Sequence, residues 1–365
     1  MLRNPCCRIF TDRSQTRNAD ARFRPFPGFE DPGSPRVMRS RGFSATDLLQ
    51  LRDGSAPTIY QSHPRYDPTG DFARGGFRMQ TVLDGLWFGE GPRWHQERLW
   101  FSDMHGHRVL STDLAGDLRT EVEMTADEPS GLGWLPDGRL LVVAMESQQL
   151  RRVEHDGRLA LHADLSAIAR GSLNDMIVAS DGTAYVGDMG SRIHDGGERQ
   201  PGQTIAVRSD GSWFVAADQL ESPNGHVLTA DEAVLLVAES AAARVTAFDR
   251  RPDGTLANRR VYAALRPSPD GPPFAPPDGI CLDAEGAVWV ADPIGARVFR
   301  VLPGGQTTAE HRFDGLIPVA CVLGGPDRRT LSVCAAADWK REEVLKAPTG
   351  VILAIDTEIS GVGRP

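Results

Sequence analysis

Four oxygen-bearing side chains recur at one phase of a repeat in this chain. Glu90, Asn174, Asn224 and Asp278 each stand about ten positions before a short apolar run. Carboxylate and amide oxygens are the ligands that hard divalent cations prefer. If each repeat is one blade of a closed ring, equivalent positions converge on its axis. We therefore predict that these four residues hold one divalent cation, with open positions left for water and substrate.

Each of these residues also has a simpler interpretation. Asn and Asp favour turns, and each residue stands beside Gly, Pro or another turn-forming residue. Four oxygen-bearing residues at the same phase of the repeat favour a shared site over four unrelated turns. Ser130 and Cys321 take the same phase in the other two repeats, and we expect them to be structural.

The repeat itself predicts the fold. Equivalent apolar runs are spaced by about 40 to just over 50 residues, which is the length of a propeller blade. In each repeat a turn, often Asp-Gly, joins two short strands, and a third strand with alternating polarity follows. Turns after several third strands indicate a fourth strand. The sequence therefore predicts an all-β, six-bladed propeller with four antiparallel strands per blade. The apolar runs are 99–104, 140–145, 184–189, 235–240, 288–293 and 331–336.

The strand that closes the ring is predicted from the two ends of the repeat region. The sixth repeat ends near Thr357 without a clear fourth strand, and residues 80–83 precede the first repeat with no repeat of their own. We expect residues 80–83 to supply the missing outer strand, which hides sheet edges that would otherwise invite aggregation. A β-sandwich of short strands is the alternative, but six aligned copies weigh against it.

Residues 1–78 differ in composition from the rest. They are rich in Arg, Pro, Gly, Ser and Asp and show no sustained period. We expect this extension to be disordered or to lie upstream of a true start at Met79. A targeting segment and a functional arm are the alternatives. Residues 79–365 are then the propeller domain.

Bulk properties exclude several partners. The formal net charge is −9, which argues against nucleic acid, and no apolar run approaches the roughly 18 residues of a membrane helix. The five cysteines form no disulfide framework or Cys-x-x-Cys metal pair. A cytoplasmic protein without nucleic-acid or membrane partners is predicted, and the oligomeric state is left open.

Several short motifs resemble one family. They resemble the family of senescence marker protein (regucalcin), gluconolactonase and luciferin-regenerating enzyme, over about residues 80–357. The resemblance implies a six-bladed propeller with Glu90, Asn224 and Asp278 as divalent-metal ligands. It implies that Asn174 contacts substrate or completes the metal shell, and that Asp278 is the general base. The motifs are Gly89-Glu-Gly-Pro92, Asn174-Asp175, Ser222-Pro-Asn-Gly225, Pro277-Asp-Gly-Ile280 and Gly324-Gly-Pro-Asp327.

The chain departs from the sugar lactonases of that family at one position. Ser172 stands two residues before the Asn-Asp pair, where those members carry an arginine that binds substrate hydroxyls. The loops after each second strand return to the mouth that carries the ligands, so we expect His105 and Arg192, which lie in these loops, to contact substrate. We expect Asn174 and Ser172 to contact substrate from the positions that the resemblance gives them. His105 could instead be a solvated loop residue.

The predicted activity is hydrolysis of a lactone. A divalent cation would polarise the carbonyl, and a carboxylate would activate water. Ca²⁺ is the first candidate, and Mn²⁺, Mg²⁺, Zn²⁺ and Fe²⁺ are alternatives. The expected partner is a small-molecule lactone. Two other functions stay open: an organophosphate or other ester hydrolase on the same site, and a non-catalytic binding propeller stabilised by its metal.

Overall fold

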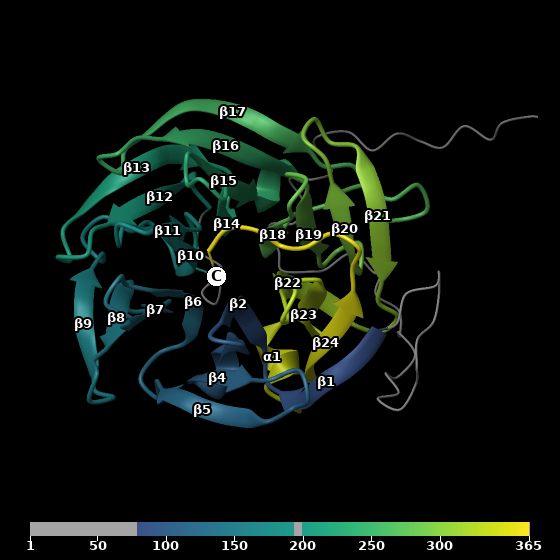
Figure 1. Cartoon of the computed structure of the whole chain (residues 1–365), viewed down its shortest axis with the longest axis horizontal. Helices are drawn as coiled ribbons and strands as arrows, with labels where there is room; N and C mark the ends of the chain where they lie inside the picture. The colour runs from purple at the N-terminus through teal and green to yellow at the C-terminus, as the bar shows by residue number, and fades with distance from the viewer. Residues whose placement is uncertain (1–78, 193–198, 365) are drawn as a thin grey trace, which may run out of the picture. The chain divides into compact units, whose positions relative to one another are not determined.

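Six four-stranded antiparallel sheets are arranged around a central axis (Figure 1). The computed structural model describes residues 79–192 and 199–364. The six-bladed, all-β architecture predicted from the repeat is confirmed. The predicted extension, residues 1–78, lies outside the described residues.

The first three blades use consecutive strands, with the first strand innermost and the fourth outermost. Blade 1 contains β2 (Gly89–His95), β3 (Arg98–Asp103), β4 (Arg108–Thr112) and β5 (Leu118–Glu123). Blade 2 contains β6 (Pro129–Trp134), β7 (Leu140–Ala144), β8 (Gln149–Val153) and β9 (Leu159–Asp164). Blade 3 contains β10 (Leu173–Val178), β11 (Ala184–Asp188), β12 (Gly202–Val207) and β13 (Trp213–Leu220).

The next two blades follow the same order, and the last closes the ring. Blade 4 contains β14 (Pro223–Leu228), β15 (Val234–Glu239), β16 (Arg244–Arg250) and β17 (Leu256–Ala264). Blade 5 contains β18 (Ile280–Leu282), β19 (Val288–Asp292), β20 (Arg297–Val301) and β21 (Thr307–Arg312). Blade 6 contains β22 (Ile317–Gly324), β23 (Thr330–Ala336), β24 (Gly350–Asp356) and β1 (Met79–Leu86).

Closure by the N-terminal strand is confirmed. Strand β1 pairs antiparallel with β24, with Gln80 opposite Ala354. The predicted closing segment, residues 80–83, lies inside β1. Strand β1 thus covers the outer edge of β24, which would otherwise be open to edge-to-edge association.

Helices are few in the described residues. The α-helix α1 (Arg341–Val344) lies in the β23–β24 connection, and 3₁₀ turns cover Met104–Gly106 and Ser240–Ala242. No helix within 79–192 or 199–364 combines the length and the apolar character that crossing a bilayer requires.

Acidic residues at the ends of second strands form hydrogen bonds next to the start of the innermost strands. Asp103 Oδ2 accepts a hydrogen bond from Arg108 Nη2 at 2.9 Å, while its Oδ1 accepts one from the Phe88 backbone N–H at 2.9 Å. Glu239 pairs in the same way with Arg244, with Nε to Oε1 at 2.8 Å. In blades 1 and 4 the acid and the arginine five residues later are therefore structural, and the acid accepts a hydrogen bond from the backbone just before the innermost strand.

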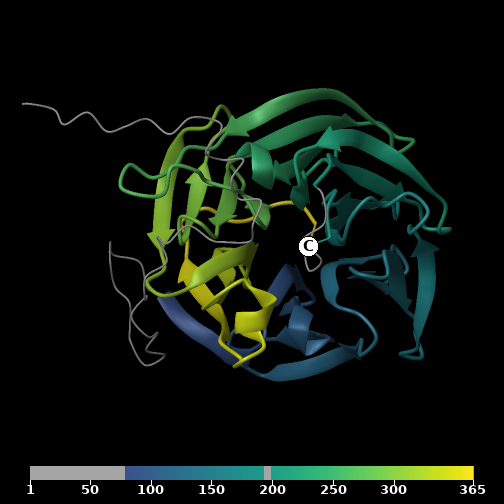
Figure 2. The same ribbon diagram turned by 180° about the vertical axis from the view of Figure 1, so that it is seen from behind.

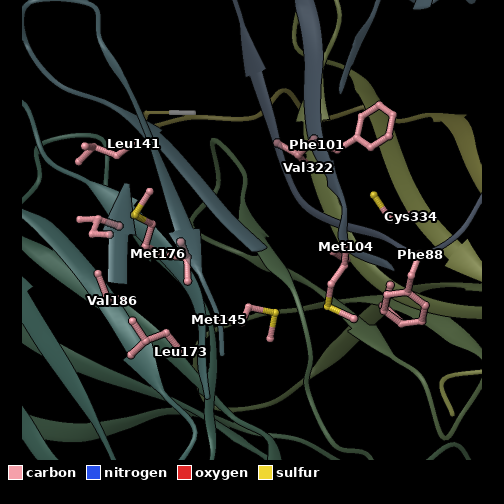
Figure 3. Packing of buried hydrophobic residues seen from close by; sticks show 14 of the residues in the cluster. Phe88, Phe101, Met104, Leu141, Met145, Leu173, Met176, Val186, Val322 and Cys334 are labelled. Atoms are coloured by element: carbon pink, nitrogen blue, oxygen red, sulfur yellow. The ribbon is translucent and has the colours of Figure 1, made fainter. Parts of the chain in front are cut away.

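Apolar side chains fill the space between neighbouring blades. The cluster in Figure 3 joins Phe101 of blade 1, Leu141 of blade 2, Met176 of blade 3 and Val322 of blade 6. All four are at most 6 % exposed. Close packing of this kind resists changes in volume, so it holds the innermost strands at fixed angles around the axis.

The predicted position of Cys321 in the ring was wrong. The Gly279 N–H donates to the Val319 carbonyl oxygen as the Gly225 N–H donates to that of Asp278, so Val319 takes the phase of Glu90. Cys321 lies two residues further along β22. The reason is the longer hairpin of blade 6, in which counting back ten positions from β23 ends inside β22 instead of at its start.

Candidate functional site

The innermost strands bring the four predicted ligand residues to one end of the central channel. Glu90, Asn174 and Asn224 are the second residues of β2, β10 and β14, and Asp278 precedes β18 by two residues. Figure 1 shows these strands around the centre of the ring. Residues separated by up to 188 positions in the chain therefore meet near the axis.

Glycines after three of these residues allow the strands to approach closely. A Cβ on Gly225 would lie 2.6 Å from the Ile280 backbone nitrogen and 2.8 Å from the Asp278 carbonyl oxygen. A Cβ on Gly279 would lie 2.6 Å from Ala320 Cα. The Glu-Gly, Asn-Gly and Asp-Gly pairs of the sequence are thus required by packing at the axis, in addition to any turn preference.

Hydrogen bonds orient the oxygens at this end of the channel. The Asn224 side chain hydrogen-bonds the Asp278 carboxyl group. Ser130 Oγ donates to Asn174 Oδ1 at 2.9 Å, and the Gly91 N–H donates to Glu90 Oε2 at 3.2 Å. Asn224 and Asp278, predicted to share a site, are therefore in direct contact.

Both carboxyl groups are held in an unfavourable environment for negative charge. Burial raises the pKa of Glu90 well above its usual value, and the charges of Asp278 and Asp175 raise it further. Burial also raises the pKa of Asp278 to about 7, against a lowering contribution from the Asn224 hydrogen bond and a raising one from Asp175. Removal from water and nearby like charge both disfavour ionisation.

Asp175 is a member of this cluster that the sequence argument did not single out. It is 6 % exposed, and its Oδ1 accepts from Arg93 Nη2 at 2.6 Å. Arg93 is the cation that neutralises it. Within the described residues, Glu90 and Asp278 form no ion pair, so two buried carboxylates near the axis lack a compensating positive charge.

A divalent cation fits this donor set. Two carboxylates and two amide oxygens suit Ca²⁺, Mg²⁺ or Mn²⁺, and a cation would supply the missing charge. The described residues contain no group of three or more His, Cys, Asp or Glu arranged to hold a metal. That finding is compatible with the fit, because two of the four oxygen donors come from Asn.

The predicted substrate contact His105 lies beside a cleft at the same end of the propeller. His105 is 4 % exposed, and its Nδ1 lies 3.1 Å from Glu128 Oε1. Arg341 of α1 donates from Nε to the same oxygen at 3.2 Å. The cleft, of about 800 Å³, is lined by Met104, His105, Leu345 and residues 339–342. His105 is thus a buried, hydrogen-bonded residue and not a solvated loop histidine.

Ser172 and Arg192 converge on one acidic residue. Ser172 Oγ donates to Glu146 Oε1 at 2.6 Å, and Arg192 Nη1 lies 3.2 Å from Glu146 Oε2. The Glu146 and Glu128 backbone N–H groups both donate to Asp127 Oδ1. The His105 and Ser172 groups are therefore linked along one rim. Glu128 and Glu146 were not predicted as its organising residues, because loop positions alone do not reveal a side chain's partner.

Comparisons with known proteins agree with this geometry. A family model described as the SMP-30/Gluconolactonase/LRE-like region matches residues 88–337. Regucalcin of Xenopus laevis is 26 % identical over 276 residues, covering 72 % of this chain and 89 % of that protein. A solved gluconolactonase from Xanthomonas campestris is 26 % identical, with a TM-score of 0.60 over 77 % of this chain and 90 % of that one.

Two further relatives add detail. A 6-deoxy-6-sulfogluconolactonase of Pseudomonas putida is 25 % identical over 170 residues, which is 46 % of this chain and 57 % of that protein. A structure of regucalcin from Agrobacterium tumefaciens, described as a calcium-binding protein, has a TM-score of 0.65 over 78 % of this chain and 95 % of that one. At 21 % identity, that structural likeness shows the fold alone.

Proposed function

Because this chain belongs to the SMP-30/gluconolactonase/LRE-like family, we propose that it is a divalent-cation-dependent hydrolase that opens a lactone. One observation carries the proposal. Glu90 and Asp278 are carboxyl groups with raised pKa values and no ion-pair partner among the described residues, and they lie near two amide side chains at the end of the channel where β2, β10 and β14 begin. The gluconolactonase relatives supply the class of reaction.

Glu90, Asn174, Asn224 and Asp278 would hold the cation, with Ca²⁺ as the first candidate. A bound divalent cation would polarise the lactone carbonyl and stabilise the developing oxyanion. Use of Ca²⁺ is favoured by the all-oxygen donor set, which suits a hard ion.

Asp278 is the proposed general base. Its carboxylate would accept a proton from the attacking water, and the hydrogen bond from Asn224 fixes its direction. A base whose pKa lies near the working pH is effective, although a bound cation would lower that pKa. Asn174, oriented by Ser130, would position the substrate.

The rim is proposed to select a polar substrate. Trp339, Lys340 and Arg341 line the cleft, and Arg192 lies on the Glu146 side of the same rim. Guanidinium groups bind hydroxyls and acidic substituents through several N–H donors. Ser172 and Arg192 both contact Glu146, so Arg192 lies beside the position where sugar lactonases carry an arginine. We propose that Arg192 supplies that guanidinium.

The test is metal-dependent turnover by the full chain. The protein would be stripped with a chelator, reloaded with Ca²⁺, Mn²⁺, Mg²⁺, Zn²⁺ or Fe²⁺ in turn, and assayed by acid release on γ- and δ-lactones. Asn224→Ala and Asp278→Ala should each lower kcat/KM by at least about tenfold, as loss of a metal ligand or its support typically does. Asp270→Asn, at an exposed turn, is the control and should retain full activity.

A charge-conserving swap separates the two roles of Asp278. The double variant N224D/D278N keeps both the number of carboxylates and the number of amides, so it should retain cation binding by calorimetry while losing turnover. Hydrolysis of phosphotriesters in preference to lactones would instead favour the ester-hydrolase alternative. Tight cation binding without turnover of any substrate would reject the enzyme proposal and favour a calcium-binding role.

A further inference from the structure

The C-terminal tail covers the other end of the central channel. The Val362 N–H donates to the Leu282 carbonyl oxygen at 3.1 Å, and the Gly361 N–H donates to the Arg328 carbonyl oxygen at 2.8 Å. Leu282 is the last residue of β18, so the tail lies at the end opposite Asp278. Figure 1 shows the tail reaching the centre of the ring, while Figure 2 views the propeller from behind.

A small cavity remains between this tail and the innermost strands. Its volume is about 30 Å³, and three arginines line it: Arg93 from β2, Arg328 from the β22–β23 turn, and Arg364 from the tail. Apolar and sulfur-bearing residues form most of the remaining wall, including Cys281 and Cys321. Among the residues that the structure describes, no Asp or Glu lines the cavity.

Two of the three guanidinium groups are incompletely satisfied. Arg93 is 6 % exposed, and its Nε is buried without a hydrogen-bond partner. Arg328 Nε is also buried and unpartnered. The two Nη atoms of Arg328 reach only carbonyl oxygens of the tail, Gly363 at 2.8 Å and Val362 at 3.3 Å. Buried donors without acceptors are rare and call for a ligand or a structural reason.

One of the three positive charges at this end lacks a carboxylate partner. Asp175 neutralises Arg93 at 2.6 Å, and Arg364 Nε lies 3.9 Å from Glu232 Oε1. Arg328 has no carboxylate partner within residues 79–192 and 199–364. Water could accept from the Arg328 Nε group, but it would not offset the charge of this half-buried guanidinium.

We propose that this cavity is a binding site for one small inorganic anion of the size of chloride, held between Arg93 and Arg328. The volume admits one or two water-sized species. It is too small for a sugar, a nucleotide or a carboxylic acid with a carbon chain. Charge-assisted hydrogen bonds to an anion would satisfy both Nε donors at once. The site is distinct from the candidate cation site, because Arg93 lies three residues deeper along β2 than Glu90.

The direct test uses bromide as the probe on the full-length wild-type protein. Crystals grown or soaked in sodium bromide should show one anomalous peak in the cavity, within hydrogen-bond distance of the Arg93 and Arg328 Nε atoms. Waters alone in the cavity at saturating bromide would overturn the proposal. This measurement needs no variant, so it holds even if substitutions at Arg328 impair folding.

The solution test uses chloride and a matched pair of variants. Arg328→Gln should broaden the ³⁵Cl NMR signal less than wild type and weaken chloride binding by about tenfold or more, as loss of a charged contact does. Arg329→Gln removes the same charge from the adjacent exposed position and should behave as wild type. Thermal melting in sodium chloride should rise and saturate for wild type and R329Q, against sodium isethionate at equal ionic strength. Equal chloride responses in R328Q and R329Q would refute the site.

Discussion

Removal of the cation should make the stability of this protein fall as the pH rises from 5 to 8. The folded protein holds Asp278 at a pKa of about 7, against a usual value of 3.8. A carboxyl group whose pKa is raised by folding does not lower the unfolding free energy below its unfolded pKa, because it is protonated in both states there. Its cost grows as the pH rises through the interval and is complete above the folded pKa. Glu90, whose pKa is also raised, acts in the same direction.

The size of the effect follows from the pKa difference. A difference of about 3 pKa units corresponds to about 4 kcal/mol of unfolding free energy at 1.36 kcal/mol per unit. About 3 kcal/mol of this loss in unfolding free energy occurs above pH 5, because the remainder occurs between pH 3.8 and 5. For a domain of this size 1 kcal/mol shifts the melting temperature by about 2 °C, so the apo protein should lose about 6 °C relative to the loaded protein over this range.

The assay is thermal melting of chelated and Ca²⁺-loaded protein at half-unit steps of pH. Taking the difference between the two states removes groups unrelated to the site. Buried histidines such as His162 and His311, whose pKa values burial lowers, contribute equally to both. Asp278→Asn should abolish most of the pH-dependent difference. If the difference is flat from pH 5 to 8, or if D278N keeps it, then Asp278 is not an uncompensated charge at a cation site.

Three further outcomes are expected. Gly225→Ala should lower the unfolding free energy by roughly 1–3 kcal/mol through overpacking, because the added Cβ would lie within 3 Å of Asp278 and Ile280 backbone atoms. It should also weaken Ca²⁺ binding measured by calorimetry. Unchanged binding would show that the approach of β14 to β18 does not position the site. Arg192→Gln should raise KM for polar lactones several-fold with little change in kcat, whereas an equal loss in kcat would place Arg192 in the chemistry. A chain starting at Met79 should melt at the same temperature as the full-length protein. A chain starting at Phe88 should melt at least several degrees lower, because it lacks β1. Equal melting temperatures for the two truncations would show that closure by β1 contributes nothing to stability.

The fold was predictable from sequence because its signals are local. Asp-Gly turns, such as the one at Gly138 with φ of 86°, indicated the hairpins. Alternation of apolar and polar residues indicated which face of a strand is buried. The closing strand was found because β24 had no outer neighbour of its own in sequence order. The error at Cys321 arose where a local count failed, because the hairpin of blade 6 is longer than the others.

The site was predictable only in part. Its ligand-type residues share a repeat phase, so symmetry brought Glu90, Asn174, Asn224 and Asp278 together without knowledge of any contact. The partners of Asp175, 82 residues from Arg93, carry no such regularity. Long-range ion pairs and the course of the C-terminal tail depend on tertiary packing, and no periodic pattern in the chain encodes them.

The two ends of the channel have opposite charge, and the Arg93–Asp175 ion pair lies between them. Glu90 and Asp278 lie at one end, and Arg328 and Arg364 lie at the other, with Arg93 and Asp175 between. The charge of Arg93 lowers the pKa of Glu90, while that of Asp175 raises it. An anion beside Arg93 would therefore weaken the field that opposes a cation near Glu90, and a bound cation would strengthen the field that attracts the anion. Such coupling is reciprocal by linkage, so the proposed cation and the proposed anion would each stabilise binding of the other.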